Sequence, residues 1–199
     1  MKTVFWMLLL MAVVSMGSAQ AAALFTQCPP VGVNTGCQFL ITINATGIPT
    51  VAMDPNVPNN GPYDGSDDTL VGVLNNSSRT ITSLPLSSST NIFAFDGDGA
   101  CTQTPGPANC GPDPSGYGSP NATFTAINAG ATAGTVLFPA GLAPGGSTWF
   151  DLEDALASST QITPGTPGGT GGGTVPEPAS MTLLGGGAAF LLVVARRRK

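Results

Sequence analysis

The fold class is decided by two apolar stretches, Gln-Phe-Leu-Ile-Thr-Ile at residues 38–43 and Thr-Leu-Val-Gly-Val-Leu at residues 69–74. In the first stretch Phe39, Ile41 and Ile43 alternate with other residues and would share one face of a strand. The second stretch is apolar on both faces, which is typical of a strand at the centre of a sheet. We therefore predict two β-strands, of which the second is central.

Five more short segments have the alternation or composition of strands. They are residues 79–84, 91–95, 123–127, 135–138 and 148–152. The sequence Asn-Asn-Ser-Ser at residues 75–78 predicts a hairpin turn between the strands on either side of it. No stretch before Asp151 shows helical periodicity. The sequence thus predicts an all-β fold, an antiparallel β-sandwich of about seven to eight short strands.

The N-terminal segment, residues 1–23, has the three parts of a secretory signal peptide. Lys2 supplies the positive charge, residues 4–14 form the apolar run, and Ala19 and Ala21 give a small-residue cleavage site. Cleavage two residues later fits nearly as well, and an uncleaved membrane anchor is the alternative. We predict a signal helix that takes no part in the fold of the exported protein.

The C-terminal segment, residues 175–199, consists of a short box, an apolar span over residues 179–195 and a basic cluster. The box is Val175, Pro176, Glu177 and Pro178, and the basic cluster is Arg196, Arg197, Arg198 and Lys199. As a helix, the span would be roughly 25 Å long, which crosses a membrane when the flanking arginines snorkel. Four consecutive cations argue against a buried core helix. They predict a transmembrane helix with the preceding chain outside.

This tripartite tail resembles the PEP-CTERM sorting signal of Gram-negative bacteria. The same tail is also called an ice-binding protein C-terminal domain, a name that does not imply ice binding here. The resemblance implies recognition by an exosortase, a membrane enzyme thought to cleave near the motif, so that residues 175–178 would be bound as substrate. It also implies transient anchoring in the inner membrane, followed by export to the cell surface or extracellular matrix.

A linker and one ectodomain are expected between these two signals. Residues 163–173 hold six Gly and two Pro, so we expect residues 158–174 to be a flexible linker. The ectodomain then spans residues 24–157, long enough for one hydrophobic core. Over most of residues 63–152 it resembles an ectodomain that recurs in front of PEP-CTERM tails. That resemblance implies a β-rich fold and assigns no catalytic residue.

The charge of the ectodomain is strongly negative. Between residues 24 and 174 there are ten acidic residues and one basic residue, Arg79, a formal balance of −9. Nothing in this region could neutralise phosphates, which argues against a nucleic-acid partner. The sequence contains no histidine, which excludes Ser-His-Asp and Cys-His catalysis and His-ligated zinc.

The four cysteines form two pairs with equal spacing, Cys28 with Cys37 and Cys101 with Cys110. Four cysteines allow three pairings. In an exported chain the short spacing favours two local disulfides, each closing a loop rich in Gly, Pro and Asn. A zinc site made of all four cysteines is the alternative, and the oxidising compartment argues against it.

Two acidic loops are candidates for a calcium site. Asp64, Asp67 and Asp68 lie in the first loop, and Asp96 and Asp98 lie in the second. Asp96 and Asp98 are the expected ligands, with help from Asp64 or Asp67. Calcium takes six to eight oxygen ligands from carboxylates and carbonyls on a tightly turning backbone. The pattern is not an EF-hand, because no acid stands at the twelfth position. The alternative is that Asp and Gly only build turns.

Three further features could carry function. Paired carboxylates could form a glycosidase site, but the ectodomain has only one Trp and two Tyr to line a sugar cleft. Trp149 would be a sugar-stacking candidate if it were exposed. The acidic run at residues 151–154 is expected to be a solvated strand edge. We therefore expect no enzyme.

Together these observations predict an exported surface or matrix protein with a structural or adhesive role linked to exopolysaccharide. The alternative is a calcium-dependent module that binds carbohydrate or protein.

Overall fold

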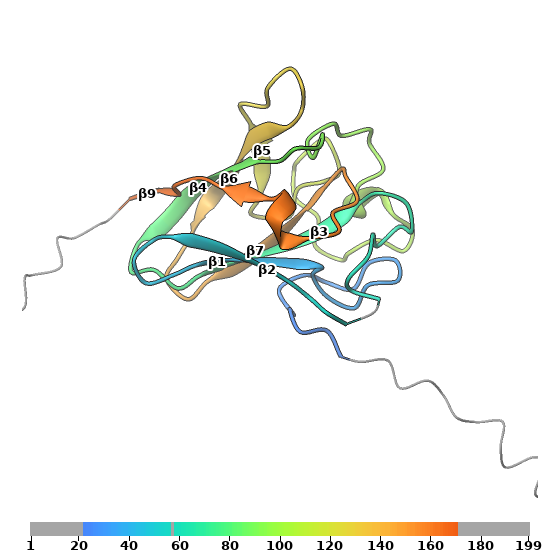
Figure 1. The fold of residues 1–199 in the computed structure, drawn as a ribbon, viewed down its shortest axis with the longest axis horizontal. Helices are drawn as coiled ribbons and strands as arrows, with labels where there is room; N and C mark the ends of the chain where they lie inside the picture. The colour runs from blue at the N-terminus through green and yellow to red at the C-terminus, as the bar shows by residue number, and fades with distance from the viewer. Residues whose placement is uncertain (1–21, 57, 171–199) are drawn as a thin grey trace, which may run out of the picture.

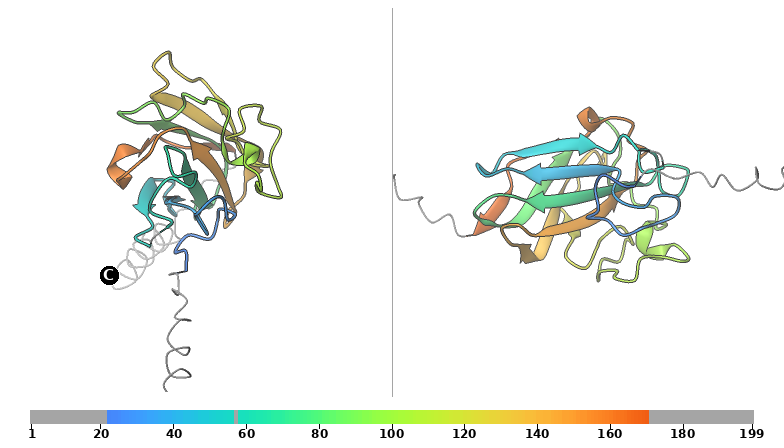
Figure 2. Two further views of the ribbon diagram at one scale, coloured as in Figure 1. Left: turned by 90° about the vertical axis from the view of Figure 1, so that its right-hand side faces the viewer. Right: turned by 90° about the horizontal axis from the view of Figure 1, so that it is seen from below.

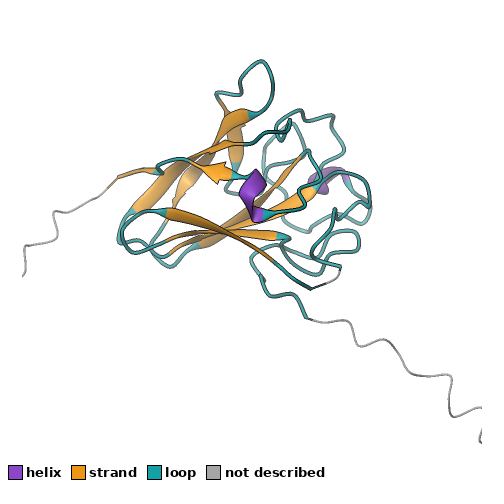
Figure 3. Ribbon diagram, viewed as in Figure 1, coloured by secondary structure: helices purple, strands orange, loops and turns teal. Residues whose placement is uncertain are grey.

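The computed structural model describes residues 22–56 and 58–170. This part of the chain forms two β-sheets and two short 3-10 helices, η1 (Ala100–Thr102) and η2 (Ser159–Gln161) (Figures 1 and 3). The prediction of an all-β fold is confirmed. None of the described helices is long and apolar enough to cross a membrane. The predicted signal helix and the predicted transmembrane helix at residues 179–195 lie outside the described residues.

The first sheet has four strands in the order β2-β1-β3-β7 (Figure 2, right). They are β2 (Pro49–Met53), β1 (Phe39–Ile43), β3 (Thr69–Asn75) and β7 (Ser147–Leu152). β3 is a central strand, as its apolar sequence predicts. The expectation of a purely antiparallel architecture is wrong, because β1 and β3 pair in parallel. β2 turns back along one side of β1, so the chain must return through a long loop to add β3 on the other side.

The second sheet contains five strands, and all its pairings are antiparallel. They are β5 (Thr123–Thr125), β6 (Ala133–Leu142), β4 (Thr80–Ser87), β8 (Thr163–Pro164) and β9 (Gly168–Thr170). β6 lies between β5 and β4, whereas β8 and β9 both pair with β4. The long strands β4 and β6 therefore form the body of this sheet.

Residues 75–78 do not form the predicted hairpin turn, because β3 and β4 belong to different sheets. The turn carries the chain from one sheet to the other. The buried Asn75 amide donates to the carbonyls of Arg79 and Leu142, both at 2.7 Å, and its Oδ1 accepts from Ser77. The side chain of Asn75 thus replaces ladder hydrogen bonds where the chain leaves the first sheet.

One hydrophobic cluster joins the two sheets. Phe39 and Phe150 come from the first sheet, and Leu84 and Phe138 come from the second. A smaller cluster covers the opposite face of the first sheet. Here the N-terminal segment packs over β3 and β7 (Figure 2, right, blue). Because it is covered on both faces, β3 can be apolar on both faces.

The prediction that residues 158–174 form a flexible linker is wrong where the described part of this segment pairs with β4. Residues 163–164 and 168–170 form β8 and β9 and pair with β4. A Cβ atom on Gly169 would overlap the backbone carbonyl of Thr80. Glycine is therefore needed at this position for close approach of two backbones, and does not indicate a free tether there.

The predicted strand at residues 91–95 is absent. The backbone turns at this point, with Ala94 N donating to Asn91 O. Phe93 is nevertheless buried in the main cluster, and its ring packs edge-on against that of Phe95 at a centroid distance of 5.9 Å. Phe93 and Phe95 alternate in the sequence because their rings pack into the core from a loop, and not because this segment pairs as a strand.

Candidate functional site

Three loops meet beyond the same end of the first sheet, which is the end where most loops gather (Figure 3). Asp68 immediately precedes β3, and Glu153 immediately follows β7. Because these two strands are antiparallel neighbours, with Thr69 opposite Leu152, both carboxyl groups emerge side by side. The loop that holds Asp96 and Asp98 comes from elsewhere in the chain and is joined to Glu153 by hydrogen bonds, one direct and others through the Tyr117 hydroxyl.

Tyr63 connects two buried carboxyl groups. Its hydroxyl oxygen lies 2.6 Å from Asp68 Oδ2 and 2.9 Å from Asp151 Oδ2. Asp151 Oδ2 also accepts a hydrogen bond from the backbone N–H of Ala100, at 2.7 Å. A phenol has one proton and can donate it to only one acceptor at a time. The phenol can therefore donate to only one of these two carboxyl groups, and the other contact is favourable only if that carboxyl group carries a proton or a nearby cation offsets its charge.

Tyr117 occupies the same position in a second group of acids. Its hydroxyl oxygen lies 2.6 Å from Glu153 Oε2, 2.8 Å from Asp98 Oδ1 and 3.2 Å from Asp96 Oδ1. The Asp96 backbone N–H also donates to Glu153 Oε2, at 3.1 Å. Again one phenolic proton faces several carboxyl oxygens.

We call these side chains the acid–tyrosine cluster. It consists of Tyr63, Asp68, Asp96, Asp98, Tyr117, Asp151 and Glu153. Arg79 is the only basic residue in the described part of the chain, and it lies just beyond Asn75, at the opposite end of β3. Five carboxyl groups thus share one region without a basic side chain to balance their charge.

The pKa values of most acids in the cluster are raised, mainly by burial. Burial raises the pKa of Asp151 well above its ordinary value and that of Asp68 to about 7. Burial also raises the pKa of Glu153, whereas a side-chain hydrogen bond between Asp98 and Asp96 raises the first pKa and lowers the second. Desolvation raises the pKa of both tyrosines, so both phenols keep their protons.

The loops that hold these side chains are locally fixed. Gly97 has a φ of 102°, in the region that favours glycine, and turns the chain between Asp96 and Asp98. In the first loop, Asp64 Oδ1 accepts from the backbone N–H groups of Ser66, Asp67 and Asp68. Asp64 therefore serves as a turn-building residue.

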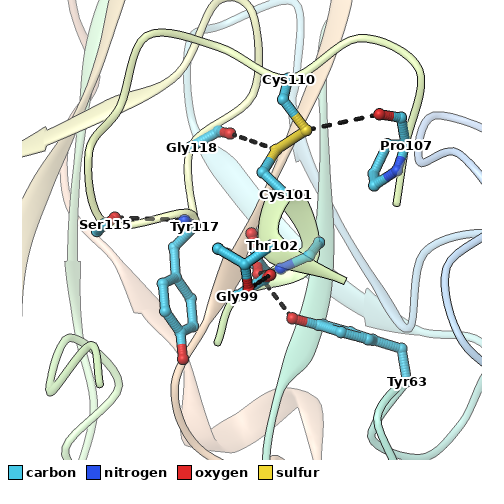
Figure 4. The surroundings of a disulfide bond; sticks show 11 residues. Tyr63, Gly99, Cys101, Thr102, Pro107, Cys110, Ser115, Tyr117 and Gly118 are labelled. Atoms are coloured by element: carbon cyan, nitrogen blue, oxygen red, sulfur yellow. Dashed lines mark hydrogen bonds between the residues drawn. A yellow bond between two sulfur atoms is a disulfide. The ribbon is translucent and has the colours of Figure 1, made fainter. Parts of the chain in front are cut away.

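A disulfide between Cys101 and Cys110 closes the loop that separates Asp98 from Tyr117. Figure 4 shows this disulfide, with the side chains of Tyr63 and Tyr117 on one side of it in that view. The Cys101 backbone N–H donates to the carbonyl of Gly116, next to Tyr117. The cross-link therefore restrains the segment between Asp98 and Tyr117, two members of the cluster.

The other predicted disulfide, between Cys28 and Cys37, is also formed. Both cysteines are buried with Trp149 in the smaller cluster on the outer face of the first sheet. Trp149 is only 7% exposed, so it is not available for stacking on a sugar.

The structure brings together a different set of acids from the one predicted for calcium. Carboxylate oxygens of Asp68, Asp98 and Glu153 lie within 4.8 Å of one another. Asp98 was in the predicted set, and Asp96 contacts it through Tyr117. Asp64 instead caps its own turn, and Asp67 is exposed. The expectation that residues 151–154 are a solvated edge is wrong for Asp151, which is fully buried.

Sequence reasoning missed Asp68 and Glu153 as partners in one site. Asp151 could have been placed correctly, because it lies two residues after Trp149 and so shares its face of β7. Tyr63 and Tyr117 carried no recognisable signal, since their partners come from distant parts of the sequence.

The sorting signal at the C-terminus lies outside the described residues and can be compared with known proteins by sequence. Residues 174–199 match the family model of the PEP-CTERM protein-sorting motif. The chain carries a PEP-CTERM sorting motif. No curated protein and no solved structure matches the chain. The PEP-CTERM match includes the box at residues 175–178 and the basic cluster at residues 196–199, and it does not extend to the β-rich region.

Proposed function

We propose that this chain is an exported surface or extracellular-matrix protein whose PEP-CTERM tail is processed by an exosortase. The observation that carries the proposal is the match of residues 174–199 to the sorting motif. The N-terminal signal at residues 1–23 would start export. The apolar span at residues 179–195 would hold the chain in the inner membrane until processing.

The ectodomain in this proposal is a β-sandwich with a structural or adhesive role in an exopolysaccharide matrix. The shared hydrophobic cluster between the two sheets supports the sandwich. Two disulfides and a high content of turns suit a small domain that works outside the cell.

The position of β9, the last described strand, supports an arrangement in which the loops around the acid–tyrosine cluster point away from the C-terminal tail. Thr170, in β9, pairs with Thr80, next to the end of β3 that carries Asn75. Asp68 lies beyond the opposite end of β3, and Figure 1 shows β9 and the gathered loops at opposite ends of the sheets. A strand of this length spans about 20 Å. The acid–tyrosine cluster would therefore face away from the C-terminal attachment.

A calcium-dependent module that binds carbohydrate or protein is the second candidate. A hollow next to the cluster favours it, with Phe95, Ser115 and Phe124 among its lining residues. The ring of Phe95 stacks on that of Tyr117 at a centroid distance of 4.4 Å. An apolar wall beside acidic groups is suited to a sugar that presents both a ring face and hydroxyl groups.

The proposal predicts no catalytic turnover. A carboxyl group with a raised pKa beside other acids could serve as a general acid, so a panel of polysaccharides and glycosides should be assayed. Turnover by the wild type that is lost in Asp68→Asn would contradict the proposal.

The experiment that tests the matrix role is fractionation of the native host. The protein should be followed in the wild type, in a strain without the exosortase and in a strain without exopolysaccharide. We expect surface display to need the exosortase and retention on the cell to need the polysaccharide. Surface display that is unchanged without the exosortase would contradict the sorting step. Retention that is unchanged without the polysaccharide would contradict the matrix role.

A further inference from the structure

We propose that Asp68, Asp98 and Glu153 form a binding site for a divalent cation of the calcium class. The site goes beyond the sorting function, because it lies in the ectodomain and does not depend on the PEP-CTERM tail. Ligands come from three separate places in the sequence, the residue before β3, the loop before η1 and the residue after β7.

The first observation is the placement of the oxygen atoms. One carboxylate oxygen from each of the three residues lies within 4.8 Å of the other two. Asp68 is buried, Glu153 is half-buried and Asp98 is exposed. The site therefore has a fixed inner ligand and an open side through which an ion and its remaining waters could enter. Asp96 and the Tyr117 hydroxyl supply further oxygens next to the three ligands.

The second observation is a buried carboxylate oxygen without a partner. Asp68 is 1% exposed, and its Oδ2 is held by Tyr63, whereas its Oδ1 has no hydrogen-bond partner in the described part of the chain. Asp151, which shares the Tyr63 hydroxyl with Asp68, is fully buried, and its Oδ1 also has no hydrogen-bond partner among the described residues. A buried carboxylate oxygen without a donor is costly, and a coordinated cation satisfies it.

The third observation is the shortage of donors around the tyrosines. Tyr63 and Tyr117 have two protons between them and face five carboxyl groups. No basic side chain reaches this end of the described chain, since its only Arg is at the opposite end. A divalent cation balances two negative charges at once and removes the need for extra protons.

The chemistry of the donors selects the class of ion. All of them are carboxylate or hydroxyl oxygens, and both cysteine pairs in the described chain are disulfides. Hard oxygen donors suit calcium and magnesium, and a set of three protein carboxylates suits calcium better, because magnesium usually binds through one or two carboxylates and keeps several waters. Calcium sites of extracellular modules have dissociation constants of about 10⁻⁴ to 10⁻³ M, so we expect binding in that range.

The test uses the full oxidised chain, purified in detergent and stripped with a chelator. Calcium binding is measured by calorimetry, and terbium is added as a luminescent probe. Tyr117 contacts two of the ligands, so terbium in the site should be sensitised by tyrosine excitation and displaced by calcium.

Asp98→Asn and Glu153→Gln should each weaken calcium binding at least about tenfold. Asp67→Asn removes the same charge from an exposed neighbour outside the three ligands and should change affinity by less than about threefold.

Several results would overturn the site. The proposal would be wrong if calcium up to 10 mM, roughly ten times the weakest expected dissociation constant, released no heat in the calorimeter and displaced no terbium. Equal losses of affinity in Asp67→Asn and Asp98→Asn would show diffuse attraction of ions to an acidic surface. Asp98 is exposed, so its variant should fold; retained calcium affinity in a folded Asp98→Asn would also contradict the proposal.

Discussion

Tyr63 and Asp151 are 88 residues apart in the sequence, and the phenolic oxygen of one lies 2.9 Å from the buried Oδ2 of the other. This contact ties the loop before β3 to the interior of β7. It also buries the carboxyl group of Asp151, whose negative charge must then be neutralised by a proton or balanced by a nearby cation. The behaviour of the chain with pH should follow from this arrangement.

In the absence of divalent cations, the free energy of unfolding should fall as pH rises from about 4 to 7. Asp68 has its pKa raised from 3.8 to about 7, and the pKa values of Asp151, Glu153 and Asp98 are raised as well. In this range the folded chain holds protons that the unfolded chain has released, so raising the pH favours unfolding. The lowered pKa of Asp96 acts in the opposite direction, below about pH 4.

Thermal unfolding of the chelated chain at pH 5, 6, 7 and 8 checks this prediction. Asp68→Asn removes one of the titrating groups and should flatten the dependence between pH 5 and 7. A melting temperature that rises steadily from pH 5 to 8 in the chelated wild type would be incompatible with protonated acids in the cluster.

Asn75→Ala should lower the free energy of unfolding by about 2 kcal/mol, because one buried carbonyl and one part-buried carbonyl lose their donor. These are the carbonyls of Arg79 and Leu142. Asn76→Ala is the matched control, since Asn76 is exposed and its one hydrogen bond within the described residues is from its backbone N–H to the Ile43 carbonyl. Its effect should stay within about 0.5 kcal/mol. Urea unfolding measures both, and equal effects would contradict the role given to Asn75.

Replacement of Cys101 and Cys110 by serine should cost roughly 2–3 kcal/mol, the loop-closure value for a short disulfide. The same change should weaken calcium binding, because the loop between Asp98 and Tyr117 loses its cross-link. Urea unfolding and calorimetry on the same sample measure the two effects. Unchanged calcium affinity in the destabilised variant would mean that the disulfide stabilises the fold without shaping the site.

Gly169→Ala should destabilise the chain by about 1–3 kcal/mol, because the added Cβ would overlap the carbonyl of Thr80. Gly130→Ala is the control, since a Cβ there meets only the Thr132 side chain, at ordinary contact distance. Thermal unfolding distinguishes the two variants. If Gly169→Ala were as stable as the wild type, β9 would not be part of the folded domain.

Strands with strong apolar patterns could be predicted from the sequence, and strands that depend on neighbours could not. β1, β3 and β7 were found near their true bounds because alternating or continuous apolar residues are needed wherever a sheet is buried. β2 alternates between half-buried and exposed positions at the sheet edge and was missed. β9 was missed because its glycines are required by the closeness of β4, a contact that the sequence does not display.

The chemical type of the ligands in the candidate site could be predicted from the sequence, but the set of residues that form the site could not. The Asp-Gly-Asp turn at residues 96–98 indicated oxygen ligands, and Asp98 does lie in the cluster. Its partners are set by the antiparallel pairing that puts Thr69 opposite Leu152. That register depends on the whole sheet, so the juxtaposition of Asp68 and Glu153 could not be read from local spacing.

The most direct test of the central claim is the intact mass of the protein isolated from its own host, with and without the exosortase. We predict that the mature protein lacks the residues that follow the box at 175–178, and that it keeps them in the strain without the enzyme. A mass that includes the basic cluster at residues 196–199 in both strains would contradict exosortase-dependent sorting.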